Sequence, residues 1–564
     1  MFNVHDEGIK NTIEKLSNII RAENIDNSNY VELYAGEEIN KINNIKNQII
    51  YGRRGTGKTH LLKALQETLV ESFDKEAYLP IYIDLRKLLP LISDSENNPT
   101  YYAVIMFKYI IQEIIDSIIE NISFICKLNE WEEKVFVGKI RTEVTELLKD
   151  LNYEFNGYSI KKIGDIQLSE EETKRLSGSL KLSLNPEGSL DAKKQSHKTV
   201  TSQETKYISF AEISNIVSKL PLKFHITRVF CLLDEWSEIP INVQPYLAEL
   251  LKRGFITSKY TFKIAAITTR AKVGFKTENK YLGMEDGGDV FGFPLDNRYV
   301  FEINKQTTRD FFNELLYKHL SDISDEIKIE FRGDKLNRAK NNFINLYFAN
   351  QALREILIAS AGIPRDFINL FINAYDKFLL NNSGNKRIGV KDIRMATIDW
   401  YETDKKEEVD SNIYAKKLLE KIVNEIIIKK KKTHFLIPEK YSNEPHLQKL
   451  IDLRVVHLRK KGYSHKGVSG VSFNVYSVDY GCYTVLNIHQ PKLDTDLISQ
   501  IDIIDNFREI RRVALGDDFF NEFLLEVGEG FNCPFCNKPV NTNHLAYQKQ
   551  GLCNNCFERL SNAS

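Results

Sequence analysis

Long uncharged apolar segments are absent from this sequence of 564 residues. No window approaches the roughly 18 apolar residues that a membrane-spanning helix needs, so no contact with membranes is predicted. The opening residues, MFNVHDEGIKNTIEKL, contain no basic segment followed by an apolar one, and we expect no secretion leader. Lys and Arg (77) balance Asp and Glu (77), so no global electrostatic field attracts nucleic acid. Any such contact has to come from a local patch.

Cysteine is scarce as well, with seven residues in the chain. Cys126, Cys231 and Cys482 stand singly in apolar or strand-like segments, which argues against a disulfide framework. The remaining four form two CxxC pairs near the C-terminal end, a pattern typical of a metal site in a reducing compartment. We therefore expect a cytoplasmic protein.

Short apolar runs alternate with helical periodicity over the first 300 or so residues, and the total length predicts three or four domains. Because strands separated by helices pair in parallel, we predict an α/β fold with a parallel five-stranded sheet covered on both faces. The expected strands are 47–52 (NQIIYG), 78–85, 228–236, 262–269 and 298–303 (RYVFEI), and the expected helices between them include 60–73, 101–150, 208–220 and 245–255.

Residues 152–206 interrupt this alternation, because Ser, Lys, Glu, Gly and Asn dominate them. We interpret the segment as an exposed insertion, with a hairpin at 180–188 (LKLSL and the turn NPEG) inside a flexible loop. A disordered, solvated spacer fits the same composition equally well.

A phosphate-binding loop is the strongest motif in the sequence. Residues 52–59 read GRRGTGKT and match G-x-x-x-x-G-K-[ST] between a predicted strand and a predicted helix. Glycines let such a loop curl so that backbone amides point at phosphates, and the helix N-terminus adds partial positive charge. Lys58 is expected to reach the β- and γ-phosphates of ATP, and Thr59 to bind Mg²⁺. A glycine-rich turn with a chance lysine is the alternative. The other residues expected to bind nucleotide are Gly52, Gly55, Thr56 and Gly57.

The predicted strand 228–236 ends in the acids that complete such a site. Asp234 is expected to hold Mg²⁺, and the adjacent Glu235 to act as a general base that polarises the attacking water. The pair therefore predicts hydrolysis as well as binding. The alternative is that it only caps the following helix.

These motifs resemble AAA+ ATPases of the origin-recognition or initiator-like branch, over about residues 30–405 without the insertion. The resemblance implies that Thr268 or Thr269, after the strand 262–269, is the sensor 1 residue that orients the hydrolytic water. It also implies that GIPRD (362–366) is a sensor 2 motif, in which Arg365 contacts the γ-phosphate from a helical lid. VELYAGEE (31–38) resembles the segment that packs near adenine.

The resemblance further implies a homo-oligomer. Arg298, directly before RYVFEI, stands where the family often places the arginine finger offered to a neighbouring subunit, and Arg270 is a rival for that role. A finger of this kind supplies positive charge to the transition state. The family's nucleotide acts as a switch between sheet and lid, so ATP is expected to promote assembly.

Residues 410–490 resemble the winged-helix domain that many initiator-like ATPases carry after the lid. An amphipathic helix (412–432) ends in lysines at 429–432, with Lys421 on the same element, and is followed by strand 434–438, helix 446–454 and strands 455–461, 471–479 and 483–489 (YTVLNIH). DNA phosphates are one expected partner of this basic stretch, 421–466. A solvated helix face is the alternative interpretation of the lysines, and no obvious recognition helix carries the triplets of Arg, Asn and Gln that read base edges. Arg459, Lys460, Lys461 and Lys466 complete the basic set.

Two CxxC pairs, Cys533/Cys536 and Cys553/Cys556, are separated by 16 residues and predict a four-cysteine zinc ribbon. Four thiolates leave no open coordination position, so the zinc would be structural and would supply folding free energy. His544 lies between the pairs and is expected to be a loop residue. DNA and protein both remain open as partners of the ribbon.

We therefore expect four domains: an AAA+ nucleotide-binding domain (1–304), a helical lid (305–405), a winged-helix-like α+β domain (410–490) and a zinc ribbon (527–564). The expected function is that of an ATP-hydrolysing switch or motor, associated with DNA, that recruits or licenses a protein partner in an initiator-like, mobile-element or antiviral phage-defence role. The alternatives are a signalling ATPase that oligomerises on ATP and binds only proteins, and a degenerate ATPase that binds nucleotide without hydrolysis.

Overall fold

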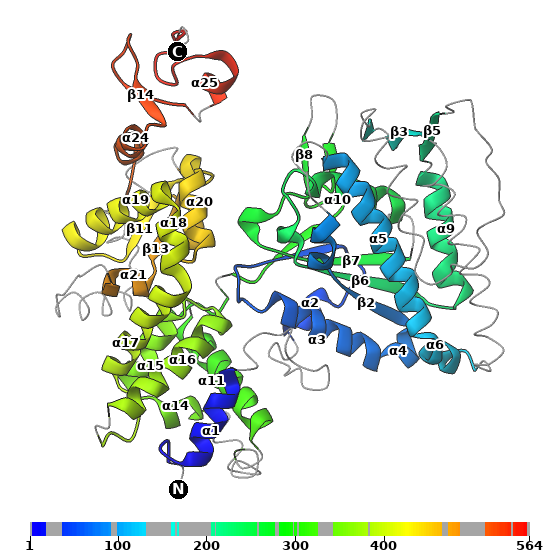
Figure 1. Ribbon diagram of the computed structural model, residues 1–564, viewed down its shortest axis with the longest axis horizontal. Helices are drawn as coiled ribbons and strands as arrows, with labels where there is room; N and C mark the ends of the chain where they lie inside the picture. The colour runs from blue at the N-terminus through cyan, green and yellow to red at the C-terminus, as the bar shows by residue number, and fades with distance from the viewer. Residues whose placement is uncertain are drawn as a thin grey trace. The chain divides into compact units, whose positions relative to one another are not determined.

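The computed structural model describes most of the chain and divides it into two compact units (Figure 1). We call Asp26–Gly52 with Gly57–Leu295 the sheet unit, and Met1–Ile25, Arg53–Thr56 and Asp296–Ser564 the lid unit. The domain boundaries expected from the sequence stay a prediction. The described residues are 3–17, 37–91, 99–130, 159–163, 166–167, 205–208, 210–255, 259–276, 281–296, 298–301, 304–324, 327, 342–381, 384–464, 472–485, 514–542 and 545–560.

The sheet unit is built on five parallel strands in the order β10-β1-β7-β6-β2, which confirms the predicted fold class. Four of the strands lie where the sequence predicts them. Every residue of β7 is buried and all but the first of β6, as expected for strands covered on both faces. These four are β1 (Gln48–Tyr51), β2 (Tyr78–Asp84), β6 (Arg228–Asp234) and β7 (Tyr260–Ala266).

The fifth strand is not the predicted one. It is β10 (Phe291–Pro294), which pairs in parallel with β1, whereas residues 298–301 form turns. The sequence FGFP hides this strand, because glycine and proline both disfavour strands. Proline is tolerated here because β10 lies at the edge of the sheet. The apolar residues Val300 and Phe301 are buried without forming a strand.

Helices cover both faces of the sheet. The chain moves in one direction across the sheet from β1 to β2 and in the other from β2 through β6 to β7, so right-handed connections place the helices on opposite faces. Figure 1 shows α3 on one side of the strands and α5 and α10 on the other. The helices are α2 (Glu37–Ile42), α3 (Lys58–Glu71), α4 (Phe73–Glu76), α5 (Pro99–Glu120), α6 (Ile122–Leu128), α9 (Phe210–Lys223) and α10 (Gln244–Phe255).

The predicted insertion contains strands that sequence reasoning missed. β3 (Ser159–Ile163) pairs antiparallel with β4 (Ile166–Gln167) and parallel with β5 (Thr205–Ile208). The hairpin expected at 180–188 and the helical residues expected at 131–150 lie outside the described residues. A second small hairpin joins β8 (Gly274–Lys276) to β9 (Tyr281–Gly283).

The lid unit is helical over the described part of 305–405, as the sequence predicts. Aromatic rings form much of its interior, with Phe312 against Phe367 and Tyr347 against Phe371. The N-terminal helix α1 (Glu7–Leu16) packs on α11 and α16. The lid helices are α11 (Lys305–Ile323), α14 (Ile344–Tyr347), α15 (Asn350–Ala359), α16 (Pro364–Leu380) and α17 (Val390–Trp400), which runs into a π-helical turn, Tyr401–Lys405, and α18 (Lys406–Ser411).

A three-stranded antiparallel sheet follows in the same unit, in the order β11-β13-β12. Its strands are close to their predicted positions, and the name winged helix stays a prediction. The sequence GYSHKGVSG (462–470), where a wing is expected, lies largely outside the described residues. The elements are α19 (Ile413–Ile422) with a π-helical continuation, Val423–Lys429, then β11 (His434–Pro438), α20 (Pro445–Asp452), β12 (Val456–Ser464) and β13 (Ser472–Val478).

The strand predicted at 483–489 is wrong in its described part. Residues Tyr480–Val485 form the helix α21. Its start is fixed by Asp479, whose Oδ1 accepts the backbone N–H of Gly481 at 3.1 Å. A carboxylate just before a segment satisfies free helical amides, and this local bond outweighs the strand preference of Tyr, Thr and Val.

Candidate nucleotide site

The pairing registers align the carboxyl ends of four neighbouring strands. Tyr51 of β1 lies opposite Ala266 of β7, and Asp84 of β2 lies opposite Asp234 of β6. Between them, β6 and β7 pair up to Leu233. Adjacent strands lie about 4.8 Å apart, so residues that follow these strands gather along one edge of the sheet. Ligands of open parallel sheets bind at that edge.

The phosphate loop leaves this edge directly after β1. The Gly52 N–H donates to the Ala266 carbonyl at 3.1 Å, which ties the start of the loop to the neighbouring strand. Gly57, with φ of 89°, turns the chain into α3, whose first residue is Lys58. The Lys58 ammonium donates to the Gly52 carbonyl at 2.9 Å, across the mouth of the loop. Thr59 follows in the first turn of the helix, where amides carry partial positive charge.

The tip of the loop, Arg53–Thr56, groups with the lid unit. The Arg365 N–H donates to the Gly55 carbonyl at 3.3 Å. Gly55 has φ of 82°, and a Cβ there would lie 2.9 Å from Arg365 Cβ, so only glycine fits this close approach. The arginine of the predicted sensor 2 motif therefore packs on the loop tip. Thr56 closes the turn, since its hydroxyl and its N–H both donate to the Arg53 carbonyl.

Asp234 is buried, with only 1% of its surface exposed, and both of its oxygens are engaged. Its Oδ1 accepts the Glu235 N–H at 2.8 Å, and its Oδ2 accepts the Tyr82 hydroxyl at 2.7 Å. These two donors fix the orientation of the carboxylate at the edge of the sheet.

Glu235 occupies a strained, half-buried position with φ of 58°. Burial and the neighbouring Asp234 raise its pKa, while the positive charges of Lys58 and Arg86 oppose the rise. The Glu235 side chain makes no capping hydrogen bond to the following 3₁₀ turn, Trp236–Glu238, which argues against a purely capping role. A carboxylate with a raised pKa is suited to accept a proton near neutral pH.

Thr268 and Thr269 follow β7 after Ile267, in a 3₁₀ turn, Thr268–Arg270. Thr268 is exposed and Thr269 is half-buried, so the geometry leaves the sensor 1 assignment between them open. The Ile267 N–H donates to Ser237 Oγ at 2.6 Å, and this bond fastens the turn to the segment after β6.

Arg298 lies after the fifth strand, not before it. The sequence argument for an arginine finger at this position was based on the wrong strand and no longer applies. A role for Arg298 or Arg270 in a neighbouring subunit stays a prediction.

Comparison with known proteins identifies the family. A model of the ORC-CDC6-like family matches residues 16–330, more than half of the chain, including the phosphate loop and the pair Asp234/Glu235. The chain belongs to the ORC-CDC6-like family. The expected resemblance to the origin-recognition branch of AAA+ proteins is thereby confirmed. A search of curated proteins finds no match.

Solved structures similar to this ORC-CDC6-like chain include two from Aeropyrum pernix. One is its ORC1 protein in complex with DNA, 12% identical, with 87% of this chain and 94% of that one covered and a TM-score of 0.27. The other is its ORC2 protein in ADPNP–ADP complexes, 10% identical, with 86% and 94% covered and a TM-score of 0.28. Neither superposition is close enough to carry an argument about this chain.

Three residues at the edge of the sheet were missed by sequence reasoning: Tyr82, Asp84 and Arg86. The Arg86 side chain donates to both oxygens of Asp84, from Nε to Oδ1 at 3.0 Å and from Nη2 to Oδ2 at 2.7 Å. Burial alone would raise the pKa of Asp84, but the bonds from Arg86 outweigh burial and lower it. The sequence contained a signal for Asp84, because this acid stands at the end of a predicted strand, as Asp234 does.

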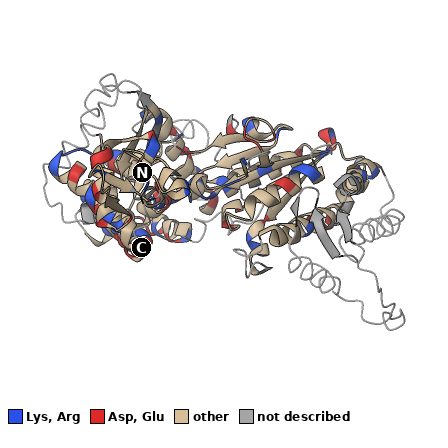
Figure 2. Cartoon of the chain, turned by 90° about the horizontal axis from the view of Figure 1, so that it is seen from above, with Lys and Arg blue, Asp and Glu red and all other residues tan. Residues whose placement is uncertain are grey.

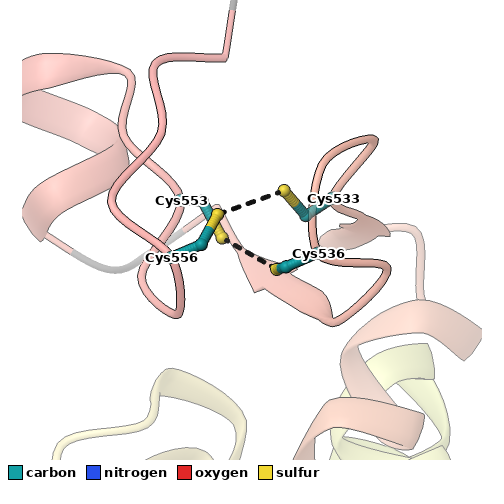
Figure 3. Close-up of side chains that lie close together, drawn as sticks. All are labelled: Cys533, Cys536, Cys553 and Cys556. Carbon is teal, nitrogen blue, oxygen red and sulfur yellow. Dashed lines mark hydrogen bonds between the residues drawn. The ribbon is translucent and has the colours of Figure 1, made fainter.

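The four predicted metal ligands lie together in the ORC-CDC6-like chain's C-terminal segment (Figure 3). Their sulfur atoms all lie within 4.8 Å of one another, with 3.7 Å between Cys533 and Cys556 and 3.8 Å between Cys536 and Cys553. A tetrahedral zinc site with bonds of about 2.3 Å has sulfur atoms about 3.8 Å apart. The residues therefore fit a metal ion. The surrounding elements are α24 (Asp517–Glu526), β14 (Gly530–Asn532), β15 (Pro539–Asn541) and α25 (Leu545–Gln550), and His544 lies outside the described residues.

Three lysines of the predicted DNA-binding stretch are paired with acids. Lys421 bonds to Glu522 and Glu526 of α24, and Lys429 and Lys430 both bond to Glu425. Figure 2 shows Lys and Arg interspersed with Asp and Glu along the described elements.

The prediction that Arg459 contacts DNA is wrong. Its side chain is buried, and its Nε donates to Ser477 Oγ at 2.8 Å. Lys461 is exposed, and Lys466 lies outside the described residues. No helix among the residues that the structure describes is long and apolar enough to cross a membrane.

Proposed function

We propose that this ORC-CDC6-like chain binds ATP with Mg²⁺ at the edge of its parallel sheet and hydrolyses it to ADP and phosphate. The observation that supports this most directly is the register that places the end of β1, with its phosphate loop, in line with Asp234 and Glu235 at the end of β6. A loop of amides, a lysine and two adjacent carboxylates are the groups that phosphoryl transfer needs.

In the proposed reaction each residue of the site has one role. Lys58 exchanges its bond to the Gly52 carbonyl for the β- and γ-phosphate oxygens. Thr59 and Asp234 would hold Mg²⁺, which supplies charge neutralisation at the phosphates when bound. Glu235 accepts a proton from water as the water oxygen bonds to the γ-phosphorus, and the bond from that phosphorus to the bridging oxygen breaks with its electron pair going to ADP. Thr268 or Thr269 orients the water, and Arg365 supplies further positive charge.

A DNA-associated role is the finer part of the proposal. Its support is membership of the ORC-CDC6-like family together with exposed basic residues such as Lys461. In this role the nucleotide state decides whether the chain recruits or licenses a protein partner.

A signalling ATPase that binds only proteins is the second candidate. The pairing of Lys421, Lys429 and Lys430 with carboxylates favours it, because neutralised lysines attract phosphates weakly.

ATP hydrolysis measured with duplex DNA, single-stranded DNA and RNA separates the two candidates. A DNA-associated switch shows stimulated turnover that falls steeply between low and physiological salt. Turnover indifferent to every nucleic acid contradicts DNA association and supports the protein-binding alternative. Sedimentation with and without a non-hydrolysable ATP analogue tests homo-oligomer formation, and an unchanged sedimentation coefficient would contradict it.

We also propose that the four cysteines hold a structural Zn²⁺. The support is the tetrahedral spacing of the sulfur atoms and a small hydrophobic core, in which Val540 and Leu560 are the buried residues besides Cys533 and Cys553. So small a core gains most of its stability from the metal.

A further inference from the structure

A buried arginine in the phosphate loop is held by side chains from distant parts of the chain. Arg53 is only 7% exposed. Its backbone N–H and its Nε both donate to Asp296 Oδ1 at 3.0 Å, and its Nη2 donates to the Ala361 carbonyl at 3.3 Å. The remaining arm, Nη1, lies 2.7 Å from Nδ1 of His457. All of these residues belong to the lid unit.

The hydrogen-bond partners of His457 determine which of its two ring nitrogens carries the proton. An arginine only donates, so Nδ1 of His457 has to be an acceptor, and the single ring proton lies on Nε2. Nε2 donates to Asp479 Oδ2 at 2.9 Å. Burial lowers the pKa of His457 well below its usual value. The bond to Asp479 opposes this change, and Arg459 and Arg53 add to it. His457 is therefore neutral and makes a directional link between Arg53 and Asp479.

The link continues through buried charges to two lid elements. Lys405, at the end of the π-helical turn, contacts the same Asp479 oxygen at 3.0 Å. Arg454, just before β12, bonds to Asp404 of that turn and to Asp366 of α16. Asp366 follows Arg365, which packs on Gly55. The loop tip, the start of α16 and the three-stranded sheet thus form one chain of polar contacts.

We propose that His457 is a positioning residue for the phosphate loop, through which the three-stranded sheet controls the loop's affinity for nucleotide. This inference rests on the proposed nucleotide site. The loop tip is covalently continuous with Gly57 and Lys58, so holding Arg53 restricts the backbone that has to curl around the phosphates. An unpaired buried arginine is unfavourable, so a shift of β12 has to move or release the loop. Coupling of this kind is reciprocal, and nucleotide binding stabilises the sheet's position in return.

Two substitutions at one position separate positioning from general stability. In His457→Asn the side-chain oxygen replaces Nδ1 and still accepts from Arg53, but the link to Asp479 is lost. In His457→Gln the amide nitrogen replaces Nε2 and keeps the link to Asp479, but the acceptor facing Arg53 is lost. We expect the dissociation constant for ADP with Mg²⁺ to stay within about twofold of the parent in His457→Asn and to rise about tenfold in His457→Gln, the effect of one charge-assisted hydrogen bond.

Arg394→Met is the control for loss of a buried ion pair, because it breaks the pair Arg394–Glu355 in the same unit, with Glu355 fully buried, and leaves Arg53 and His457 unchanged. We expect it to lower the melting temperature and leave the dissociation constant unchanged. Equal affinities for both His457 variants, whether at the parent value or below it, would overturn the inference. A parent protein without nucleotide affinity would instead overturn the proposed function.

Hydrogen exchange of the parent protein covers the case in which a variant does not fold. ADP with Mg²⁺ is expected to slow amide exchange in β12 around His457 as well as in the phosphate loop. Slowed exchange in the loop alone would contradict coupling to the sheet.

Discussion

Tyr82 donates its hydroxyl to Oδ2 of Asp234 across the pair β2–β6, at 2.7 Å. The tyrosine stands two residues before the end of its strand and reaches diagonally to the carboxylate on the neighbouring one. This bond restricts the directions from which a metal ion can approach the carboxylate of Asp234.

Removal of this hydroxyl is expected to weaken Mg²⁺ binding. In Tyr82→Phe the Mg²⁺ concentration for half-maximal ATP hydrolysis should rise about three- to tenfold, because the ligand oxygen is less well oriented. Tyr78→Phe makes the same change at the other end of β2 and is expected to behave like the parent. A Mg²⁺ titration of hydrolysis checks both variants. Identical curves for Tyr82→Phe and the parent would contradict a role for Tyr82 at the metal site.

Glu235→Gln tests the general base. Hydrolysis should fall about 100-fold or more, while ATP binding persists. Equal hydrolysis rates in variant and parent would remove Glu235 from the mechanism.

The raised pKa of Glu235 also predicts two pH effects. The parent's activity should fall on acidification at a higher pH than an ordinary glutamate would give, because only the ionised form accepts a proton. A group with a raised pKa in the folded state stabilises the protein below its unfolded pKa and loses that contribution as pH rises through the folded pKa. Glu235→Gln is therefore expected to raise the melting temperature at pH 8 relative to the parent and to change it less at pH 4. An equal shift at both values would contradict the raised pKa.

Loss of one zinc ligand should unfold only the C-terminal segment. Cys553→Ser is expected to abolish stoichiometric zinc in elemental analysis and to accelerate hydrogen exchange across 530–560, because this segment has little apolar core. Nucleotide affinity should stay within about twofold of the parent. Cys126→Ala, at a buried cysteine outside the cluster, is the control and should retain zinc. Zinc retained in Cys553→Ser would contradict the four-cysteine site.

The backbone conformation at position 362, the first residue of the predicted sensor 2 motif, requires glycine. Its φ is 77°, and a Cβ would lie 2.6 Å from the Tyr299 carbonyl oxygen. We expect Gly362→Ala to lower the free energy of unfolding by about 3 kcal/mol, from strain plus a clash. Gly384→Ala is the control, with φ of 65° but no atom within 4 Å of the added Cβ, and should lower it by about 1 kcal/mol. Thermal unfolding measures the free energy of unfolding of both variants. Equal losses in the two would contradict a clash at position 362.

Sequence patterns predicted the parts of the fold that depend on local composition. β1, β2, β6 and β7 were predicted because each is a buried apolar run, and the motifs that follow β1 and end β6 predicted where nucleotide would bind. The fifth strand was missed because pairing with β1 decides it, while its own sequence, FGFP, argues against a strand. The helix Tyr480–Val485 was missed because Asp479 accepts amides of its first turn, and these bonds outweigh the strand preference of its residues.

The contact between Arg53 and His457 joins residues more than 400 positions apart. No periodicity or motif links them, since Arg53 stands at a variable position of the phosphate loop pattern and His457 lies in the strand β12 without a motif around it. Only the folded chain brings them together. The same holds for Arg365 and Gly55, although there each residue belongs to a motif that the sequence shows.

Direct binding of ATP and ADP in the presence of Mg²⁺, measured by titration calorimetry on the purified chain and on Lys58→Ala, tests the central claim most directly. The account predicts binding of both nucleotides by the parent and a loss of affinity of at least tenfold in Lys58→Ala. Absence of any nucleotide binding by the parent, or equal affinity in the two proteins, would contradict it.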